Sequence, residues 1–288
     1  MALLAPSIVK GLYLVSTPIG TLTDISLRAL DLLERADILL AEDTRRTRHL
    51  LELYEIKLGT RKLWKYNDYS DALQRSKIVT AIDEGNSVAL LSDAGTPLIA
   101  DPGYRLVHEV ISHGQEVTSV PGASALLSAI SISGLPTDKF LFAGFVPVKQ
   151  MLKTSCFHEY SDINATVIFY ESPKRLCKTL VQMANIFGDD RDAVVCRELT
   201  KVYEEVLRGT LREIIDCLEK RKQIKGECVI LLGKKKKPVI ELKDLMQELK
   251  SATETMSRKD SVSFIAEKFG LSKREVYTRA LELRNDKD

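Results

Sequence analysis

Short apolar runs alternate with amphipathic segments through the first 120 residues, and this alternation constrains the fold more than any other feature. Four of the runs are predicted strands, at residues 12–16, 38–42, 87–93 and 116–120. Segments with apolar side chains at helical spacing lie between them, at residues 25–36, after Asp43, around Ile78 and at residues 104–113. Strands joined through helices by short connections are typical of a mostly parallel α/β sheet.

The pattern changes after Val120, where we place a domain boundary. A segment rich in small residues, VPGASALLSAISISGLP, precedes five predicted strands: FLFAGF, TVIFYE, AVVCRE, EEVLRGT and ECVILLG. Residues 202–233 predict strand, helix and strand, with antiparallel members in the sheet. Between residues 146 and 164 the pattern is irregular, which predicts a mobile loop.

The C-terminal part is predicted to be wholly helical beyond a linker, KKKKP, at residues 234–238. One helix has a single apolar face, marked by Leu242, Leu245, Met246 and Leu249. Two more helices are predicted to join at Gly270, and Ser272 with Glu275 forms a capping box for the last. This pattern resembles a helix-turn-helix. We therefore predict three domains: α/β at 1–120, α/β at 121–233, and a basic linker with a helical domain at 234–288.

Composition excludes several classes of protein. Hydrophobic residues make up 44% and charged residues 28%, as in soluble globular proteins, and no apolar run approaches the roughly 20 residues of a membrane span. The first residues continue directly into a strand, so we expect no signal peptide. The five cysteines are widely spaced and the four histidines isolated, so we expect no metal site. Reduced thiols favour a cytoplasmic location.

The net charge of +2 is unevenly distributed. From Gly233 onward there are 14 Lys and Arg against 10 Asp and Glu, a net charge of +4, so the remainder carries −2. This basic excess suggests a polyanion as partner. A lysine run is also typical of a solvated linker, and such helices also serve packing or dimerisation, so these alternatives stay open.

Three turns follow predicted strands. STPIGTL, at residues 16–22, has one glycine, where a dinucleotide fingerprint needs three and a phosphate loop needs a different spacing. It is either a structural turn or a site for an uncharged or cationic ligand. LLSDAGTPLIADPGY holds two glycines and two prolines after a buried strand, where α/β sheets bind ligands. VPGASALLSA begins a helix whose backbone N–H groups suit a carboxylate.

These three segments closely resemble one family, together with AEDTRRTRHLL, SGLPTDKFLFAGFVP, FYESPKRL and RELTKVYEEVLRGTL. The chain resembles the tetrapyrrole (corrin/porphyrin) methylase superfamily and, within it, the ribosomal RNA small-subunit methyltransferase I group. The resemblance implies two α/β domains with S-adenosylmethionine bent in the cleft between them. It also implies 2′-O-methylation of a cytidine in small-subunit ribosomal RNA, and a homodimer.

The resemblance also implies cofactor-binding residues. They are Pro18, Gly20, Asp93, Gly95, Thr96, Pro97, Ile99, Ser124, Ala125, Tyr170 and Glu171. Other superfamily members often have Gly-Asp-Pro where this chain has Gly95-Thr96-Pro97, so the implication for Thr96 concerns its backbone. The family's basic stretch after the FAGFVP segment lacks arginine and glycine here, which leaves Lys149 and Lys153 to contact RNA.

Methyl transfer to a ribose hydroxyl needs positioning rather than a metal, and a general base would add to the rate. Carboxylates at strand ends are the candidates: Glu42, Asp43, Glu171 and Glu198. Asp43 is equally suited to cap a helix, and Glu198 to pair with Arg197 or Lys201, so the base is not resolved. Candidate phosphate contacts are Arg45 and Lys174 beside the active site, with Lys273 and Arg274 in the tail.

Two other functions stay open. The chain could methylate a small corrin or porphyrin precursor, although a small substrate requires no basic helical tail. It could instead be a nucleic-acid-binding regulator whose α/β part senses a ligand. The turns are more extensive than a sensor needs, but they do not exclude one.

Overall fold

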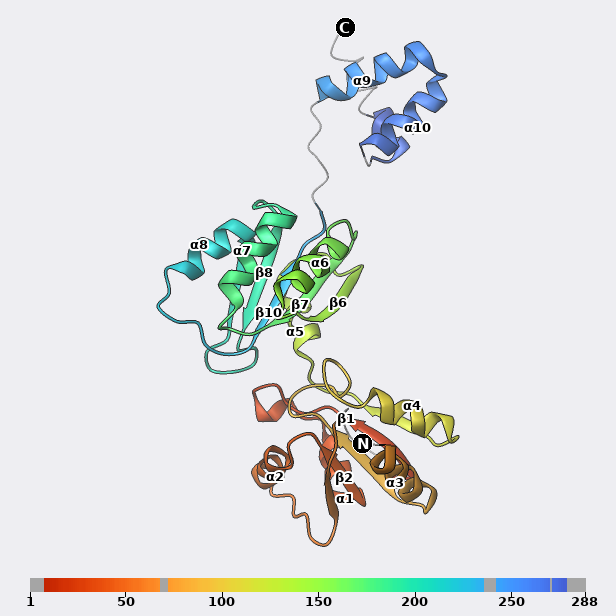
Figure 1. Cartoon of the computed structure of the whole chain (residues 1–288), viewed down its shortest axis with the longest axis vertical. Coiled ribbons are helices and arrows are strands. Elements are labelled where there is room, and N and C mark those ends of the chain that lie inside the picture. The colour runs from red at the N-terminus through yellow and green to blue at the C-terminus, as the bar shows by residue number, and fades with distance from the viewer. Residues whose placement is uncertain (1–7, 68–71, 236–241, 270, 279–288) are drawn as a thin grey trace, which may run out of the picture. The chain divides into compact units, whose positions relative to one another are not determined.

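The computed structural model describes residues 8–67, 72–235, 242–269 and 271–278. They belong to two compact units, Met1–Lys234 and Lys235–Asp288 (Figure 1). The first unit contains two five-stranded sheets and the second is helical. This confirms the predicted class of two α/β parts followed by helices. The further division of the first unit at residue 120 stays a prediction.

All strand pairs of the first sheet are parallel, in the order β3-β2-β4-β1-β5. The strands are β1 (Gly11–Val15), β2 (Ile38–Ala41), β3 (Lys62–Lys65), β4 (Ser87–Leu91) and β5 (Val117–Val120). The helical segments are η1 (Leu22–Asp24), α1 (Leu27–Arg35), α2 (Thr44–Leu53), α3 (Ala72–Asp83) and α4 (Tyr104–Ser112). The sequence pattern did not predict β3. This strand, KLWK, is short, has a lysine at each end and lies at the edge of the sheet, so it lacks the apolar run of a central strand.

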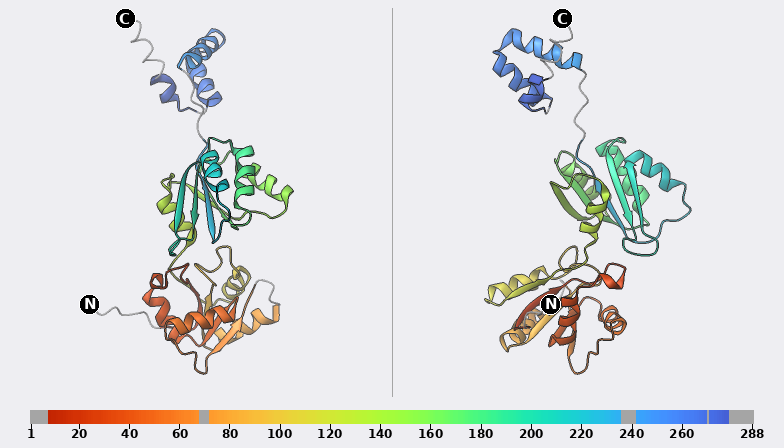
Figure 2. Two further views of the ribbon diagram at one scale, coloured as in Figure 1. Left: turned by 90° about the vertical axis from the view of Figure 1, so that its left-hand side faces the viewer. Right: turned by 180° about the vertical axis from the view of Figure 1, so that it is seen from behind.

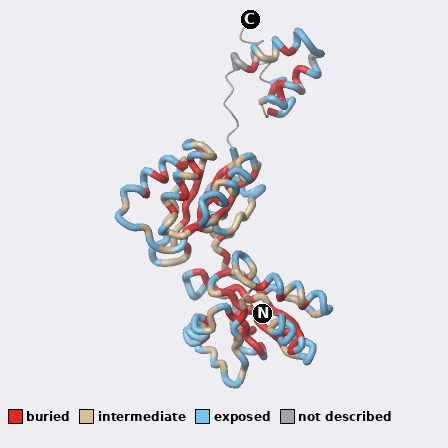
Figure 3. Tube along the Cα trace, viewed as in Figure 1, coloured by how far each residue is buried: buried red, intermediate tan, exposed pale blue. Residues whose placement is uncertain are grey.

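Side chains of alternate residues in these strands enter two cores on opposite faces. Leu40 and Leu90 pack with residues of α3 and α4, and their neighbours Leu39 and Leu91 pack with residues of α1 and α2. Figure 3 shows burial concentrated along the strands. Apolar side chains on both faces explain the continuous apolar runs in the sequence.

The second sheet is mixed, in the order β6-β7-β10-β8-β9. The strands are β6 (Phe140–Phe145), β7 (Thr166–Glu171), β8 (Asp192–Arg197), β9 (Glu205–Thr210) and β10 (Cys228–Leu232). Only β6 and β7 pair in parallel, so the predicted antiparallel members are confirmed. The helices are α5 (Ala125–Ser133), α6 (Gln150–Tyr160), α7 (Leu176–Phe187) and α8 (Leu211–Glu219).

The prediction of a mobile loop at residues 146–164 is wrong, since α6 occupies most of this segment. Phe157 on α6 is fully buried, and Lys153, one turn earlier, is only 6% exposed. The Lys153 ammonium donates to Thr179 Oγ1 at 3.4 Å. The sequence did not predict this helix because one residue of its buried face is a lysine, whose aliphatic part is buried while the residue counts as charged. The same burial makes the expected RNA contact by Lys153 wrong.

The helical unit has its own core. It contains α9 (Leu242–Thr255), α10 (Arg258–Lys268) and a helical turn at residues 273–278. Figure 2 shows α9 and α10 folded against each other, and their buried side chains include Leu245 and Ile265. Ser272 Oγ accepts from Glu275 N at 3.1 Å and Glu275 Oε2 accepts from Ser272 N at 2.6 Å, which confirms the capping box. Residues 236–238 of the predicted linker and the junction at Gly270 lie outside the described residues.

Candidate active site

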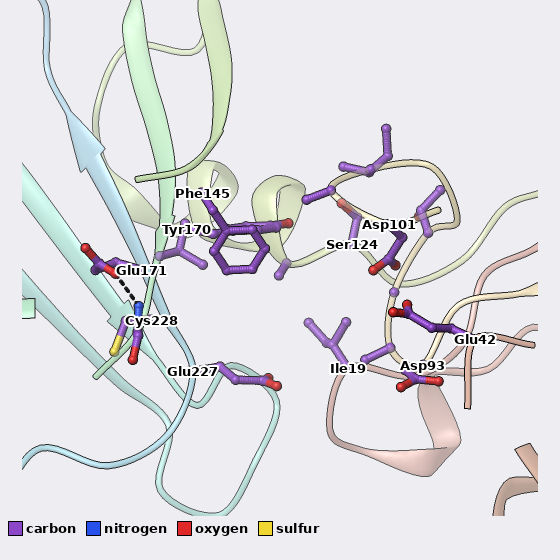
Figure 4. A pocket seen from close by; sticks show the side chains of 18 of the residues that line it. Ile19, Glu42, Asp93, Asp101, Ser124, Phe145, Tyr170, Glu171, Glu227 and Cys228 are labelled. Atoms are coloured by element: carbon purple, nitrogen blue, oxygen red, sulfur yellow. Dashed lines mark hydrogen bonds between the residues drawn. The ribbon is translucent and has the colours of Figure 1, made fainter. Parts of the chain in front are cut away.

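A cavity of about 420 Å³ lies where the carboxyl ends of the first sheet approach β7 and β10 of the second (Figure 4). Its walls come from the loop after β4, the first residues of α5, the end of β7 and the start of β10. A volume of this size is typical of a cofactor site. Open α/β sheets bind ligands beyond the carboxyl ends of their strands, as here.

The loop after β4 is fastened to the turn after β1. Gly95 donates to Thr17 O at 3.0 Å and accepts from Thr17 N at 2.9 Å. Ser16 Oγ donates to Thr96 Oγ1 at 3.1 Å, and the Thr96 hydroxyl donates to Ala123 O at 3.1 Å. The Thr96 side chain therefore joins all three turns, whereas the cofactor contact that the resemblance implies for Thr96 concerns its backbone.

Gly95 has a φ of +85°, which favours glycine. A Cβ there would lie 3.3 Å from Ile19 Cγ2. Leu98 and Ala100 also have positive φ, at 71° and 61°, so the loop holds non-glycine residues in a strained conformation. Backbone strain of this kind is often found at ligand sites.

Gly20, the single glycine of the first turn, contacts the β8–β9 loop. A Cβ at Gly20 would lie 2.6 Å from both Lys201 Cγ and Thr200 Oγ1. The next residue, Thr21, donates its N–H to Thr200 Oγ1 at 3.1 Å. The glycine therefore permits two loops to pack closely, and its neighbour Ile19 reaches the cavity.

Most of the residues implied as cofactor ligands meet in this cavity. Those on its wall are Asp93, Gly95, Thr96, Ile99, Ser124, Ala125, Tyr170 and Glu171. Pro18, Gly20 and Pro97 do not line it and instead lie in the turns that form it. The structure thus brings together segments separated by up to 78 positions, Asp93 to Glu171.

One side of the cavity is acidic. Glu42, Asp93 and Asp101 lie together beyond the ends of β2 and β4, whereas Glu227, just before β10, lies on the opposite side of the cavity (Figure 4). Burial, with the nearby charges of Glu42 and Asp93, raises the pKa of Asp101 to about 6. The sequence pattern did not single out Asp101, although it lies in the loop after β4 that holds two glycines and two prolines.

Another wall is aromatic. The ring of Tyr170 makes edge contacts with Phe142 at 4.8 Å and with Phe145 at 5.4 Å between centroids. Burial raises the pKa of Tyr170 to about 12, so its hydroxyl stays protonated. Phe145 is 59% exposed at the cavity and offers a ring face for a planar ligand.

Two of the four candidate bases are firmly held elsewhere. Asp43 caps α2 by accepting from Arg45 N at 2.9 Å, and its carboxylate pairs with the Arg45 guanidinium at 2.8 Å. These bonds hold the pKa of Asp43 well below its usual range. Glu198 does not line the cavity; its Oε1 accepts from Lys201 Nζ at 3.0 Å and from Glu227 N at 2.9 Å. Of the two expected partners of Glu198, Lys201 is the observed one.

Glu171 and Glu42 both line the cavity, in different surroundings. Glu171 is 2% exposed, and its carboxylate accepts from Ser172 N and Thr179 Oγ1, each at 2.6 Å. It also pairs with Arg175 at 2.5 Å. Glu42 is exposed, directly after the last residue of β2. Glu171 therefore has the contacts of a structural residue, whereas Glu42 faces the ligand space.

The remaining RNA candidates are exposed. The Arg45 side chain is 88% exposed and lies at the start of α2. Lys149 precedes α6, and Lys174 lies in the loop before α7. Lys273 and Arg274 begin the last helical turn of the tail.

Two findings concern other classes of site. Within the described ranges, no group of three or more His, Cys, Asp or Glu is placed to hold a metal ion. No helix among the residues that the structure describes is long and apolar enough to cross a membrane.

Comparison with known proteins gives strong sequence matches. Residues 11–215 match the family of Tetrapyrrole (Corrin/Porphyrin) Methylases, and residues 241–284 match the RsmI C-terminal HTH domain. Over 275 residues the chain is 44% identical to the Ribosomal RNA small subunit methyltransferase I of Mesorhizobium japonicum, which covers 96% of this chain and 92% of that protein. The protein of the same name from Thermotoga maritima is 43% identical and covers 77% of this chain and 98% of its own length.

Solved structures share the fold at low sequence identity. A diphthine synthase matches with a TM-score of 0.58 at 15% identity, over 77% of this chain and 89% of its own. A cobalt precorrin-4 methyltransferase matches with a TM-score of 0.56 at 19% identity, over 77% and 94%. A uroporphyrin-III C-methyl transferase from Thermus thermophilus, complexed with S-adenyl homocysteine, matches with a TM-score of 0.52 at 18% identity, over 77% and 96%.

Proposed function

Since this chain belongs to the tetrapyrrole methylase family and, within it, to the ribosomal RNA small subunit methyltransferase I group, we propose that it methylates the ribose 2′-oxygen of a cytidine in small-subunit ribosomal RNA. The methyl donor is S-adenosylmethionine. The observation that carries this proposal is the acidic and aromatic cavity in which the implied donor-binding residues meet.

The cavity residues fit S-adenosylmethionine. A sulfonium cation would relieve the crowding of Glu42, Asp93 and Asp101, which contributes to the raised pKa of Asp101. Ser124 precedes α5, whose first backbone N–H groups suit the carboxylate of an amino acid. Phe145 and Tyr170 offer ring surfaces for an adenine. The single glycine of the first turn agrees with a ligand that has no pyrophosphate.

Catalysis by this chain is mainly positioning. When bound, S-adenosylmethionine supplies an electrophilic methyl group on a positively charged sulfur. The residues of the cavity would hold that methyl in line with the ribose oxygen. As the new O–C bond forms, the C–S bond would break and S-adenosylhomocysteine would be the leaving group. The proton of the ribose hydroxyl passes to the Glu42 carboxylate, which lies beside Asp93 and Asp101.

The other three candidate carboxylates have supporting roles in this proposal. Asp43 orients Arg45 at the start of α2. Glu171 fixes the end of β7 through Arg175 and Thr179. Glu198 holds the β8–β9 loop that packs on Gly20.

We also propose that the enzyme acts as a cytoplasmic homodimer on RNA within the small subunit. Lys149, Lys174, Lys273 and Arg274 would contact phosphates, since all four side chains are exposed. Leu127 and Ile132 are exposed apolar residues of α5 and are candidates for the dimer interface.

A methyl-transfer assay with labelled donor tests the function. The acceptors are small ribosomal subunits, naked ribosomal RNA, duplex DNA and a corrin or porphyrin precursor. Label is expected in small subunits or their RNA alone. Label in the macrocycle would favour the small-molecule alternative, and DNA binding without any transfer would favour the regulator.

A further inference from the structure

We propose that a second cavity, next to the candidate active site, binds the sugar-phosphate of the RNA nucleotide that accepts the methyl group. This inference rests on the proposed function and adds the place where its substrate lies. The second cavity has a volume of about 460 Å³. It is formed by residues 42–46 at the start of α2, Lys65 and Asn67 at and after the end of β3, and Asp93 after β4.

The two cavities share part of their walls. Glu42, Arg46 and Asp93 line both. This follows from the sheet order, because β3, β2 and β4 are parallel neighbours and their carboxyl ends lie side by side. Asp43 N donates to Asp93 Oδ1 at 3.3 Å and closes the wall between the ends of β2 and β4. A group held in the second cavity therefore faces the methyl donor across Glu42.

The lining of the second cavity indicates a polar ligand. Every residue on its wall is polar or charged, whereas the first cavity includes Ile19, Phe145 and Val229. Sites for flat macrocycles and other apolar small molecules are lined mainly by apolar and aromatic side chains. A ribose with its phosphate carries hydroxyls and anionic oxygens and matches this lining.

In the second cavity, the arginine side chains are more exposed to solvent than the carboxylates with which they pair. Arg45 and Arg46 have side chains 88% and 67% exposed, whereas their partners Asp43 and Asp93 are 26% and 22% exposed. Asp43 binds Arg45 at 2.8 Å, and Asp93 binds Arg46 at 3.3 Å. Each guanidinium has five N–H donors, so these pairs orient the arginines and leave donors for a phosphate. Lys65 adds a third cation.

This arrangement of charges predicts how the acceptor nucleotide is oriented in the second cavity. The phosphate binds Arg45, Arg46 and Lys65 at the exposed rim, and the ribose lies inward, beside Glu42. The inward carboxylates repel a phosphate that enters too deeply, so they favour the hydroxyl side of the nucleotide at the methyl donor.

The test compares Arg45→Ala/Lys65→Ala with the wild-type protein on small ribosomal subunits that lack the methyl group. Both residues line the second cavity and neither lines the first. The KM for subunits is expected to rise about tenfold, with the affinity for S-adenosylmethionine unchanged in calorimetry. The log–log dependence of RNA affinity on salt should become shallower by about 0.7 for each phosphate that the variant no longer binds. Arg45→Lys/Lys65→Arg should restore most of the affinity.

The matched control is Lys220→Ala/Lys222→Ala, which removes the same charge from exposed residues after α8. It should leave KM and the salt dependence unchanged. An unchanged KM in Arg45→Ala/Lys65→Ala, with active wild-type protein, would overturn the subsite and leave the proposed function standing. An equal loss in the control would also overturn it, by showing a general charge effect. If the wild-type protein transferred no methyl to RNA, both proposals would fail together.

Discussion

Gly95 and Gly134 share a left-handed backbone conformation in different surroundings, which makes them a matched pair for testing the cavity. Their φ values are +85° and +79°, but a Cβ at Gly134 would meet nothing within 4 Å. Gly95→Leu should weaken S-adenosylmethionine binding about 100-fold or more, because the side chain enters the cavity. Gly134→Leu should cost a similar backbone strain of about 1–2 kcal/mol and leave binding intact. Calorimetry showing full binding by Gly95→Leu would refute the assignment of the cavity.

Asp101 should make donor binding depend on pH. Its pKa is raised from 3.8 to about 6, so the carboxylate is ionised above pH 6 and neutral below. Affinity for S-adenosylmethionine should therefore fall as the pH drops through 6, whereas S-adenosylhomocysteine, which lacks the sulfonium charge, should be affected less. Asp101→Asn should abolish this difference. Equal pH profiles for the two ligands in the wild-type protein would argue against a cation beside Asp101.

The same residue should affect stability with a defined sign. Because the folded-state pKa of Asp101 lies above its ordinary value, ionised Asp101 destabilises the fold above pH 6, and this cost disappears as the pH falls from about 6 to 4. Asp101→Asn should raise the free energy of unfolding of the ligand-free protein by about 1 kcal/mol at pH 8, a value reduced for partial exposure to water. Urea titrations at pH 8 and pH 4 should show the gain only at pH 8.

At the level of single residues, the sequence predicted which carboxylates directly follow a strand. It did not predict how residues distant in the sequence lie around one another. Glu42 and Asp43 both follow β2, and either could be named from position alone. The hydrogen bond from Arg45 N to Asp43 separates the roles of the two carboxylates, and it depends on the folded backbone rather than on position in the sequence. The raised pKa of Asp101 depends first on burial and then on the charges of Glu42 and Asp93, 59 and 8 positions away, so no local pattern could reveal it.

Among the elements, α6 is the one whose interpretation changed most. This helix has two buried residues, Lys153 and Phe157, and one of them is charged. Its sequence therefore does not show apolar residues repeating at helical spacing. Strands β1, β2 and β4 were predicted because both of their faces are apolar. The edge strand β3 was missed because it has only four residues and each of its faces carries one lysine beside one apolar residue. Hydrophobic periodicity therefore identified the central strands. It failed for α6, where a charged residue is buried, and for β3, which lies at the edge of the sheet.

Two lysines near the start of α6 should behave in opposite ways. Lys153→Ala should lower the free energy of unfolding by about 2 kcal/mol, because it removes buried methylenes and the bond to Thr179. Lys149→Ala, at an exposed position, should change stability by less than about 0.5 kcal/mol. RNA affinity of the folded protein should fall only in Lys149→Ala. Urea unfolding and RNA titration of both variants check this, and an RNA defect confined to Lys153→Ala would reverse the assignment.

At the scale of the whole molecule, the division at Lys234 makes the tail separable. The donor cavity lies entirely within Met1–Lys234, and the tail has its own core around Leu245 and Ile265. Truncation after Lys234 should spare donor binding, weaken RNA binding and flatten its salt dependence. Lys273→Ala/Arg274→Ala should reproduce part of the RNA effect, because both residues are exposed and Leu271 and Val276 stay in place. Unchanged affinity and slope in the double variant would assign the tail to packing instead.

The central claim is the chemistry of the product, and mass spectrometry of ribosomal RNA tests it most directly. Small subunits from cells with and without this protein would be digested to nucleosides and fragments and compared. We predict that cells lacking the protein miss one 2′-O-methylcytidine, and that the purified protein with S-adenosylmethionine restores it. A missing methyl on a base, with all ribose methyl groups intact, would contradict the proposed chemistry.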